Sequence, residues 1–270
     1  MNKDIINLEL LEKIGQIAII AGRAVMEIYK KDFDIKEKKP NHPVTEADYN
    51  SHNIIKNSLE NLKKEIPFFS EESDHIPWEE RKKWKNYWLV DPLDGTKEFI
   101  KKNGEFTINI ALISSHFPIL GVVYAPTISR IYLAAKNLGC FIKKASINEN
   151  NFHLNIDSKL IAYKEDKFSD KKLNIISSRS HINDEKMKKW LKIQNEYNLN
   201  YSGSSIKFCL VAEGKADIYP RFKPTSEWDT AAGHCILKEA GGNIRNLDGD
   251  EIKYNTKDSV INPEFIASRF

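Results

Sequence analysis

Apolar residues near the N-terminus recur every three or four positions. The repeat covers residues 8–28 and predicts one long amphipathic helix with a single buried stripe. Pro40 and Pro43 then interrupt the chain. Thr45 has a hydroxyl that suits the N-cap of a second helix, whose apolar residues continue as far as Leu62. The pattern therefore predicts two helices at the start of the chain.

Strand patterns dominate the next part of the sequence. Apolar and β-branched runs, separated by glycine or proline, predict strands at Tyr87–Val90, Phe106–Ile113, Ile119–Tyr124, Ile131–Ala135 and Cys140–Ile142. Consecutive short strands of this kind are typical of an antiparallel meander. We expect the two helices to stack on this sheet and to complete an N-terminal α+β lobe, residues 1–145.

The second half of the chain has a different rhythm. Residues 146–170 are polar and indicate an irregular connection to a C-terminal α/β lobe, residues 171–270. In that lobe strands alternate with helices, which favours a sheet covered on both faces. The predicted elements are strands Leu173–Ser177, Leu199–Ser202 and Ala216–Tyr219, helices Asp184–Ile193, Ser204–Glu213 and Trp228–Ala240, and a final glycine-punctuated hairpin.

The composition describes an ordinary globular protein. With 270 residues, 41% of them hydrophobic, the chain can bury a core without a disulfide or a structural metal. The formal net charge of +3 comes from lysines scattered in pairs, which argues against a nucleic-acid partner. The same features leave the binding of a small anion open.

Cysteine usage and hydropathy bear on the compartment. Three isolated cysteines, an odd number, favour reduced thiols. The first residues carry acidic side chains where a signal peptide needs an apolar stretch. The sequence contains no run of 18 apolar residues, so it predicts no transmembrane segment. We expect a cytoplasmic protein, with peripheral association at the inner face of the cell membrane left open and a monomer slightly favoured.

The densest chemistry in the sequence follows the predicted strand at 87–90. Asp91 ends the strand and Pro92 stops its hydrogen-bond ladder. Asp94 and Gly95 then turn the chain sharply, which holds two carboxylates close together. An Asp-Gly turn alone is more often structural than catalytic, but two carboxylates at the end of an apolar strand are candidates for a functional site.

Further acidic residues can join this pair. Glu71 follows an apolar stretch, and Asp229 lies at the start of a predicted helix. Gathered carboxylates repel one another unless a cation neutralises them, and hard oxygen ligands suit Mg²⁺ or Mn²⁺. The seven histidines show no zinc-ligand spacing and the cysteines are isolated, which argues against zinc.

Four separated motifs together resemble the signature of the inositol monophosphatase superfamily of metal-dependent, lithium-sensitive phosphatases. In chain order they are P-V-T-E-A-D at 43–48, S-E-E at 70–72, D-P-L-D-G-T at 91–96 and W-D-T-A-A-G at 228–233. The resemblance covers the chain from about residue 5 to its end. It implies a layered αβαβα sandwich, α+β and α/β in its two lobes, with the active site between them.

Other segments are similar to the bacterial 3′(2′),5′-bisphosphate nucleotidases within that superfamily, among them D-G-T-K-E-F at 94–99, G-S-S-I-K-F at 203–208 and Y-P-R-F at 219–222. This resemblance implies hydrolysis of the 3′-phosphate of adenosine 3′,5′-bisphosphate by in-line attack of a metal-activated water, with 3′-phosphoadenylyl sulfate as a further candidate substrate. The alternative is an inositol monophosphatase or a related sugar-phosphate phosphatase with the same metal centre.

The resemblance also implies roles for individual residues. Its metal ligands, for about two or three Mg²⁺ ions with Mn²⁺ as a substitute, would be Glu71, Asp91, the carbonyl of Leu93, Asp94 and Asp229. Asp48 and Thr96 would lie with Glu71 near the attacking water. Besides the residues at 93–96 and Asp229, the residues expected to bind substrate are His181, Ser204, Lys207 and Arg221.

The residues themselves leave simpler interpretations open. Asp48 can cap a helix with Thr45, because T-x-x-D is a weaker form of the capping box. Thr96 can be a turn hydroxyl, and Arg221 a solvated surface cation. Lys207 follows Ser204 by three positions in a predicted helix, which would place both on one face.

Overall fold

The computed structural model describes residues 6–39, 42–155, 158–160, 172–179 and 184–270. The first helices are α1 (Leu8–Tyr29) and α2 (Glu46–Leu62), and they confirm the two helices predicted from the apolar repeats. Between them the chain forms an antiparallel hairpin of β1 (Ile35–Lys39) and β2 (His42–Thr45). The prolines predicted only an interruption here, so this hairpin is an addition to the expected fold.

A mixed sheet follows α2. Within the described residues it has seven strands in the order of the chain, with one parallel pair at its edge and antiparallel pairs elsewhere, which confirms the meander. Its strands are β3 (Phe68–Ser70), β4 (Asn86–Asp94), β5 (Thr107–Ser114), β6 (Phe117–Ala125), β7 (Arg130–Ala135), β8 (Gly139–Lys144) and β9 (Lys159–Leu160). Its short connecting helices are α3 (Trp78–Arg81), α4 (Thr96–Ile100) and η1 (Pro126–Ile128).

The C-terminal residues form a second sheet, with described strands in the order β11-β10-β12-β14-β13. These strands are β10 (Leu173–Ser177), β11 (Tyr197–Tyr201), β12 (Ile218–Arg221), β13 (Asn243–Asn246) and β14 (Phe265–Ser268), and the helices are α5 (Glu185–Lys192), α6 (Ile206–Ala212) and α7 (Glu227–Glu239). The predicted alternation is confirmed. The last two strands pair antiparallel, but residues 247–264 separate them, so the connection is far longer than a simple hairpin.

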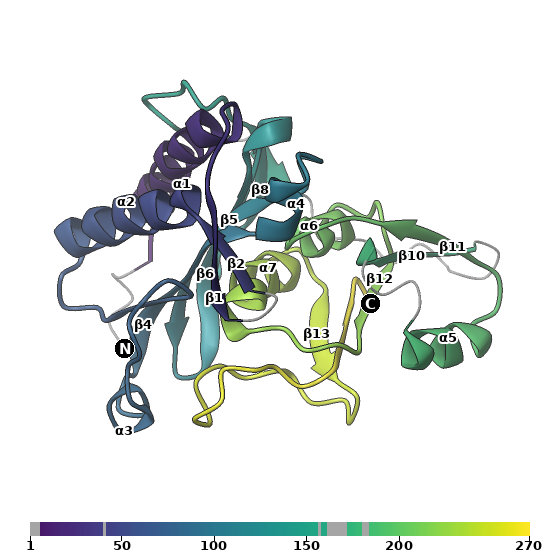
Figure 1. The fold of residues 1–270 in the computed structure, drawn as a ribbon. Coiled ribbons are helices and arrows are strands. Elements are labelled where there is room, and N and C mark those ends of the chain that lie inside the picture. The colour runs from purple at the N-terminus through teal and green to yellow at the C-terminus, as the bar shows by residue number, and fades with distance from the viewer. Residues whose placement is uncertain (1–5, 40–41, 156–157, 161–171, 180–183) are drawn as a thin grey trace.

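The elements stack in five layers (Figure 1). Helices α1 and α2 cover one face of the large sheet, and α6 and α7 lie between its other face and the small sheet. Helix α5 covers the outer face of the small sheet, where Met187 is buried against Ile175 and Ile218. This order is the αβαβα sandwich that the sequence predicts.

Helix α7 packs very closely on the large sheet. At Gly121 in β6, an added Cβ would lie 2.5 Å from the carbonyl oxygen of Ala232, so only glycine permits this approach. One cluster of buried side chains then continues from the large sheet through α6 and α7 to the small sheet. This shared core fixes the two halves of the chain against each other, and the ends of β4 and α7 meet at their junction.

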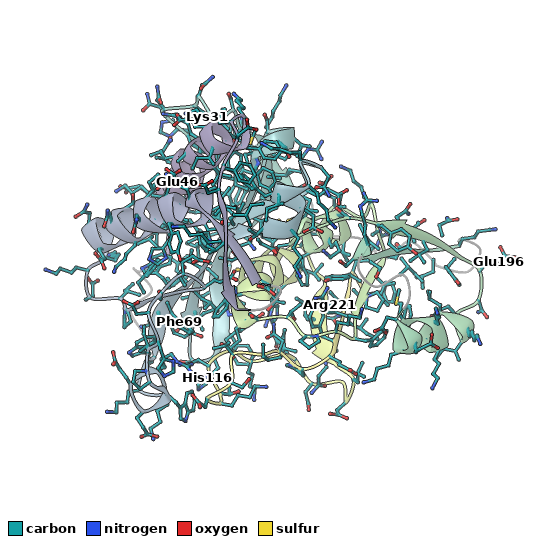
Figure 2. The ribbon with its side chains drawn as sticks, viewed as in Figure 1. Lys31, Glu46, Phe69, His116, Glu196 and Arg221 are labelled. Carbon is teal, nitrogen blue, oxygen red and sulfur yellow. The ribbon has the colours of Figure 1, made fainter. Side chains whose placement is uncertain are left out.

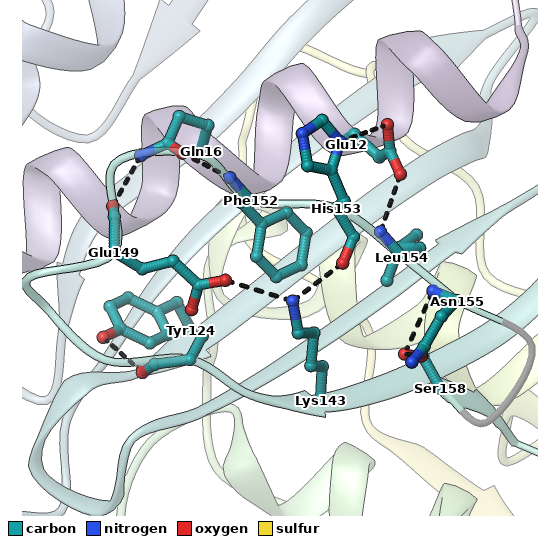
Figure 3. Close-up of polar contacts among 11 residues, drawn as sticks. Glu12, Gln16, Tyr124, Lys143, Glu149, Phe152, His153, Leu154, Asn155 and Ser158 are labelled. Carbon is teal, nitrogen blue, oxygen red and sulfur yellow. Dashed lines mark hydrogen bonds and ion pairs between the residues drawn. The ribbon is translucent and has the colours of Figure 1, made fainter.

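The chain after β8 returns across α1 (Figure 3). Gln16 donates to the carbonyl of Glu149 (3.0 Å) and accepts from the amide of Phe152 (2.9 Å), while Lys143 donates to Glu149 and to the carbonyl of His153. Much of the predicted connection, 146–170, lies outside the described residues, so the proposed domain limits stay a prediction. No described helix is long and apolar enough to cross a membrane.

Candidate active site

The turn after β4 is fixed by backbone contacts. Asp91 is buried, and its Oδ1 accepts a hydrogen bond of 3.1 Å from the amide of Leu93. The Pro92 carbonyl accepts from the hydroxyl of Ser51 in α2 (2.7 Å). Gly95 has φ +95°, and a Cβ there would lie 2.9 Å from a carbonyl oxygen, so the turn requires glycine. The Asp-Gly turn is therefore held in one conformation.

Three of the predicted acidic residues come together at this turn. Glu71 follows β3, Asp91 lies in β4, and Asp229 lies in the first turn of α7. Each offers an oxygen atom within 4.8 Å of the others. Burial and then the charge of Glu71 raise the pKa of Asp91 well above its ordinary value. Burial, followed by the charge of Asp94, raises the pKa of Asp229 to about 7.

This cluster has the chemistry of a divalent-cation site. Its donors are carboxylate oxygens, which Mg²⁺ and Mn²⁺ prefer. Each ionised carboxylate makes ionisation of its neighbours more costly, and a bound cation would remove that cost. The residues present therefore fit the expected metal, and the buried Leu93 and the part-exposed Asp94 line the same cavity as the cluster.

Asp94 is held by two polar residues that were not among the predicted site residues. Ser205 Oγ lies 2.5 Å from Asp94 Oδ2 and 2.6 Å from the carbonyl of Asp229. Asn109 in β5 donates to Ser205 Oγ (2.8 Å) and to Asp94 Oδ2 (3.4 Å). The sequence signal for Asn109 is a polar residue inside an apolar strand pattern. Ser205 lies in the G-S-S-I-K-F segment at 203–208, but only its neighbour Ser204 was expected to bind substrate.

Asp48 contacts both the start of α2 and the turn after β4. Its Oδ2 accepts from the amide and the hydroxyl of Thr45, both at 2.7 Å, which completes the capping box of α2. Its Oδ1 accepts a hydrogen bond of 3.1 Å from the hydroxyl of Thr96. Burial raises the pKa of Asp48, although hydrogen bonds from Thr45 and Thr96 oppose that rise. Thr96 Oγ1 also lies 3.2 Å from the Leu93 carbonyl, so it is a turn hydroxyl as well.

Two cavities adjoin at Asp94, Gly95 and Asp229. One, of about 380 Å³, contains the acidic cluster and Thr96. The other, of about 390 Å³, is lined by Lys97, Glu98 and Lys101 at α4 and, from the C-terminal half, by basic and polar side chains that include Arg179, Ser204, Lys207 and Arg221. A mainly acidic compartment and a mainly basic compartment therefore share one wall, which includes Asp94 and Asp229 as well as Lys97, Glu98 and Thr225.

Lys207 is buried inside the basic cavity. Its Nζ donates to the carbonyl of Ser204 and lies 5.2 Å from the centre of the Tyr219 ring. Burial lowers the pKa of Lys207 to about 8, although the charge of Asp94 opposes this and the neighbouring Arg221 contributes to it. The expected helix begins later than predicted: α6 starts at Ile206, and Ser204 precedes it with φ +45°. The two residues meet through the Ser204 backbone rather than along one helix face.

Arg221 lies at the end of β12, on the C-terminal side of the molecule (Figure 2). It donates to the carbonyls of Lys223 (3.0 Å) and Pro224 (2.9 Å), so backbone contacts orient its guanidinium in the basic cavity. Arg179, which was not predicted, lines the same cavity and forms an ion pair with Glu105. His181 lies outside the described residues.

Comparison with known proteins agrees with this geometry. The model of the inositol monophosphatase family matches residues 7–269. The 3′(2′),5′-bisphosphate nucleotidase CysQ of Shigella flexneri is 44% identical over 261 residues, which cover 96% of this chain and 99% of that protein.

Solved structures show the same architecture. The crystal structure of CysQ from Bacteroides thetaiotaomicron has a TM-score of 0.84 and 35% identity, with 98% of each chain covered. An inositol monophosphatase from Anabaena has a TM-score of 0.72 at 22% identity, with 97% of this chain and 90% of that chain covered, and supports the fold alone. The match of the family model to nearly the whole sequence carries the conclusion. The chain belongs to the inositol monophosphatase family.

Proposed function

We propose that this protein is a metal-dependent phosphatase that hydrolyses the 3′-phosphate of adenosine 3′,5′-bisphosphate and yields AMP and phosphate. The observation that carries the proposal is the pair of adjoining cavities, one acidic and one basic, with a shared wall at Asp94 and Asp229. A substrate with two phosphates can place one in each compartment. Relatives named 3′(2′),5′-bisphosphate nucleotidase, 43–44% identical to the chain, support the same activity.

The acidic cavity would hold the metal. Its ligands would be the clustered carboxylates of Glu71, Asp91 and Asp229, together with the Asp94 carboxylate and the Leu93 carbonyl from the same cavity. Bound Mg²⁺, in about two or three copies and replaceable by Mn²⁺, supplies positive charge to the phosphoryl oxygens and acidifies water. The carboxylates of the protein fix where that charge lies.

Thr96 and Asp48 would handle the proton of the attacking water. When the Thr96 hydroxyl donates to Asp48, its oxygen can accept a hydrogen bond from that water. Burial makes the Asp48 carboxylate a stronger base than an exposed one, because it raises the pKa. Glu71 lies in the same cavity and would help to orient the water. The amides of Gly95 and Thr96 would hold the reacting phosphate, since glycine permits close approach.

The basic cavity would hold the second phosphate. Lys207 and Arg221 supply the positive charge and Ser204 a hydroxyl, with His181 proposed as a further polar partner. Inositol 1-phosphate carries one phosphate and would leave these cations without a ligand. This difference favours a bisphosphate nucleotide over the alternative substrate, and it leaves 3′-phosphoadenylyl sulfate as a second candidate.

The proposal is tested by phosphate release from adenosine 3′,5′-bisphosphate and from inositol 1-phosphate, each with Mg²⁺ and with excess chelator. We expect turnover of the nucleotide only with Mg²⁺, and loss of that turnover in Asp94→Asn without loss of folding. Asp250→Asn, in an exposed turn, is the matched control. Full activity in chelator would refute the metal centre, and a preference for inositol 1-phosphate would refute the substrate.

The cellular setting remains part of the proposal. We place the enzyme in the cytoplasm, because three cysteines in an odd number suit a reducing compartment. The sequence also leads us to expect a monomer, which size-exclusion chromatography would test. Peripheral association with the inner face of the membrane was left open, and cell fractionation would test it.

A further inference from the structure

Arg81 is a buried arginine outside the two cavities of the site. It lies at the end of α3, in the connection between β3 and β4, and its side chain is only 3% exposed. Its Nε donates to the carbonyl of Ile76 (3.1 Å), its Nη1 to Asn255 Oδ1 (2.9 Å) and its Nη2 to the carbonyl of Asp258 (2.7 Å). None of the motifs in the sequence includes Arg81, and it lines neither of the two cavities of the site.

Asn255 connects Arg81 to the start of α7. The Asn255 side-chain amide donates to the carbonyl of Arg81 (2.7 Å), and its backbone amide donates to both carboxylate oxygens of Glu227, at 2.9 Å each. Glu227 is the first residue of α7, two positions before Asp229, and is buried. The contacts that start at Arg81 therefore reach Glu227, which lies about half a helical turn before the proposed metal ligand Asp229.

The other face of Arg81 meets the end of β3. The guanidinium carbon lies 5.1 Å from the centre of the Phe69 ring, a distance at which a cation is attracted to the ring. Phe69 packs edge-on against Trp228 at 5.7 Å. Phe69 lies two positions before Glu71, and Trp228 lies next to Asp229. One buried cation thus contacts Phe69 in β3 directly and reaches the start of α7 through Asn255 and through Phe69.

We infer that Arg81 is a positioning residue for the metal centre, which sets the distance between Glu71 and Asp229 through Phe69, Asn255 and Glu227. Glu71 follows β3 at the edge of the large sheet and Asp229 lies in the first turn of α7, so the two ligands come from different layers of the fold. Arg81 is suited to join them because its planar guanidinium donates in fixed directions and stacks on a ring. Partners beyond the ligands commonly change metal affinity by about 10- to 100-fold.

The inference rests on the metal centre of the proposed function, so its test measures the metal directly. Mn²⁺ binding to the full chain is followed by the EPR signal of free Mn²⁺, without substrate. Arg81→Lys keeps the charge but loses the planar set of donors. Asn255→Gly removes the side chain that Arg81 contacts and suits the φ of +53° at that position. Arg130→Lys, whose arginine pairs with Glu213 elsewhere, is the matched control.

We expect the Kd for Mn²⁺ to rise about tenfold or more in Arg81→Lys and in Asn255→Gly, and to change less than about twofold in Arg130→Lys. Binding is compared at a temperature where the near-UV circular dichroism of each variant matches that of the parent. An unchanged Kd in both variants, with only a lower Tm, would show that Arg81 supports the fold alone and would overturn the inference. Absence of Mn²⁺ binding to the parent chain would instead overturn the metal centre and, with it, the role of Arg81.

Discussion

The hydroxyl of Thr96 donates a hydrogen bond of 3.1 Å to Oδ1 of Asp48, which comes 48 positions earlier in the chain. The second carboxylate oxygen of Asp48 is occupied by Thr45 at the start of α2. One side chain therefore caps a helix with one oxygen and faces the turn after β4 with the other. The capping contacts fix the carboxylate, and this orientation leaves Oδ1 directed at Thr96.

Thr96→Val should reduce kcat strongly and leave the fold intact. Valine has nearly the shape of threonine but lacks the hydroxyl that joins the proposed attacking water to Asp48. Loss of a positioned acid–base group typically costs about 10²- to 10⁴-fold in rate. Steady-state phosphate release measures the effect.

Thr45→Ala is the matched control for this pair. It removes the hydroxyl that contacts Asp48 on the capping side, so it should lower the free energy of unfolding by about 1 kcal/mol. Its kcat should fall much less than that of Thr96→Val, because the contact from Thr96 to Asp48 remains. Equal losses of kcat in the two variants would mean that Asp48 acts only as a helix cap.

Arg221→Ala should lower kcat/KM for adenosine 3′,5′-bisphosphate by about 30- to 1000-fold, because a charge-assisted contact is worth roughly 2 to 4 kcal/mol. A substrate with a single phosphate should be affected far less, since it offers nothing for Arg221 to bind. Arg245→Ala, at an exposed position in β13, is the control. Equal losses on both substrates would assign Arg221 a structural role.

The activity should also depend on the charge of Lys207. Burial lowers the pKa of Lys207 to about 8, so the ammonium is present below that pH and is lost above it. The value of kcat/KM for the bisphosphate should therefore fall as the pH rises through about 8. In Lys207→Met the value should be lower throughout, and this alkaline decline should be absent. A decline of the same size in the variant would show that another group titrates.

Glu251 provides a prediction about stability. Contacts with His234 and Lys238 lower the pKa of Glu251 to about 2. A carboxylate with a lowered pKa stabilises the folded state above its unfolded pKa of about 4.3, and this contribution disappears as the pH falls towards 2. Glu251 is a third exposed, so Glu251→Gln should cost only about 1 kcal/mol at pH 7.

Urea denaturation across pH 2 to 7 measures this cost. The difference between Glu251→Gln and the parent should shrink as the solution becomes acidic. Glu9→Gln, at a fully exposed ion pair on α1, should show no comparable dependence. A difference that stays constant with pH would mean that the charge of Glu251 contributes nothing.

Short-range patterns were sufficient for most of the fold. The apolar repeat of α1 and the runs of β4 to β8 are long enough for their periodicity to be clear. Helix α4 was not expected, because five residues contain little more than one turn and show no repeat. The β1–β2 hairpin was missed because Pro43 argues against a strand, although proline is tolerated at a sheet edge.

The same distinction holds for the candidate site, where some residues could be predicted from local motifs and others could not. Its acidic residues belong to compact motifs, so they could be named from the sequence, and three of them meet within 4.8 Å. Asn109, Ser205 and Arg81 act through contacts between residues that are about 100 or more positions apart. Such contacts depend on how the layers pack, and no local pattern records that packing.

In the proposed mechanism the acidic cavity receives the 3′-phosphate while the basic cavity holds the 5′-phosphate. Phosphorus NMR of the products formed from adenosine 3′,5′-bisphosphate identifies which of the two phosphates has been removed. We expect 5′-AMP and inorganic phosphate with Mg²⁺, and no product in excess chelator. Formation of 3′-AMP, or of either product without a divalent metal, would refute this arrangement of the substrate.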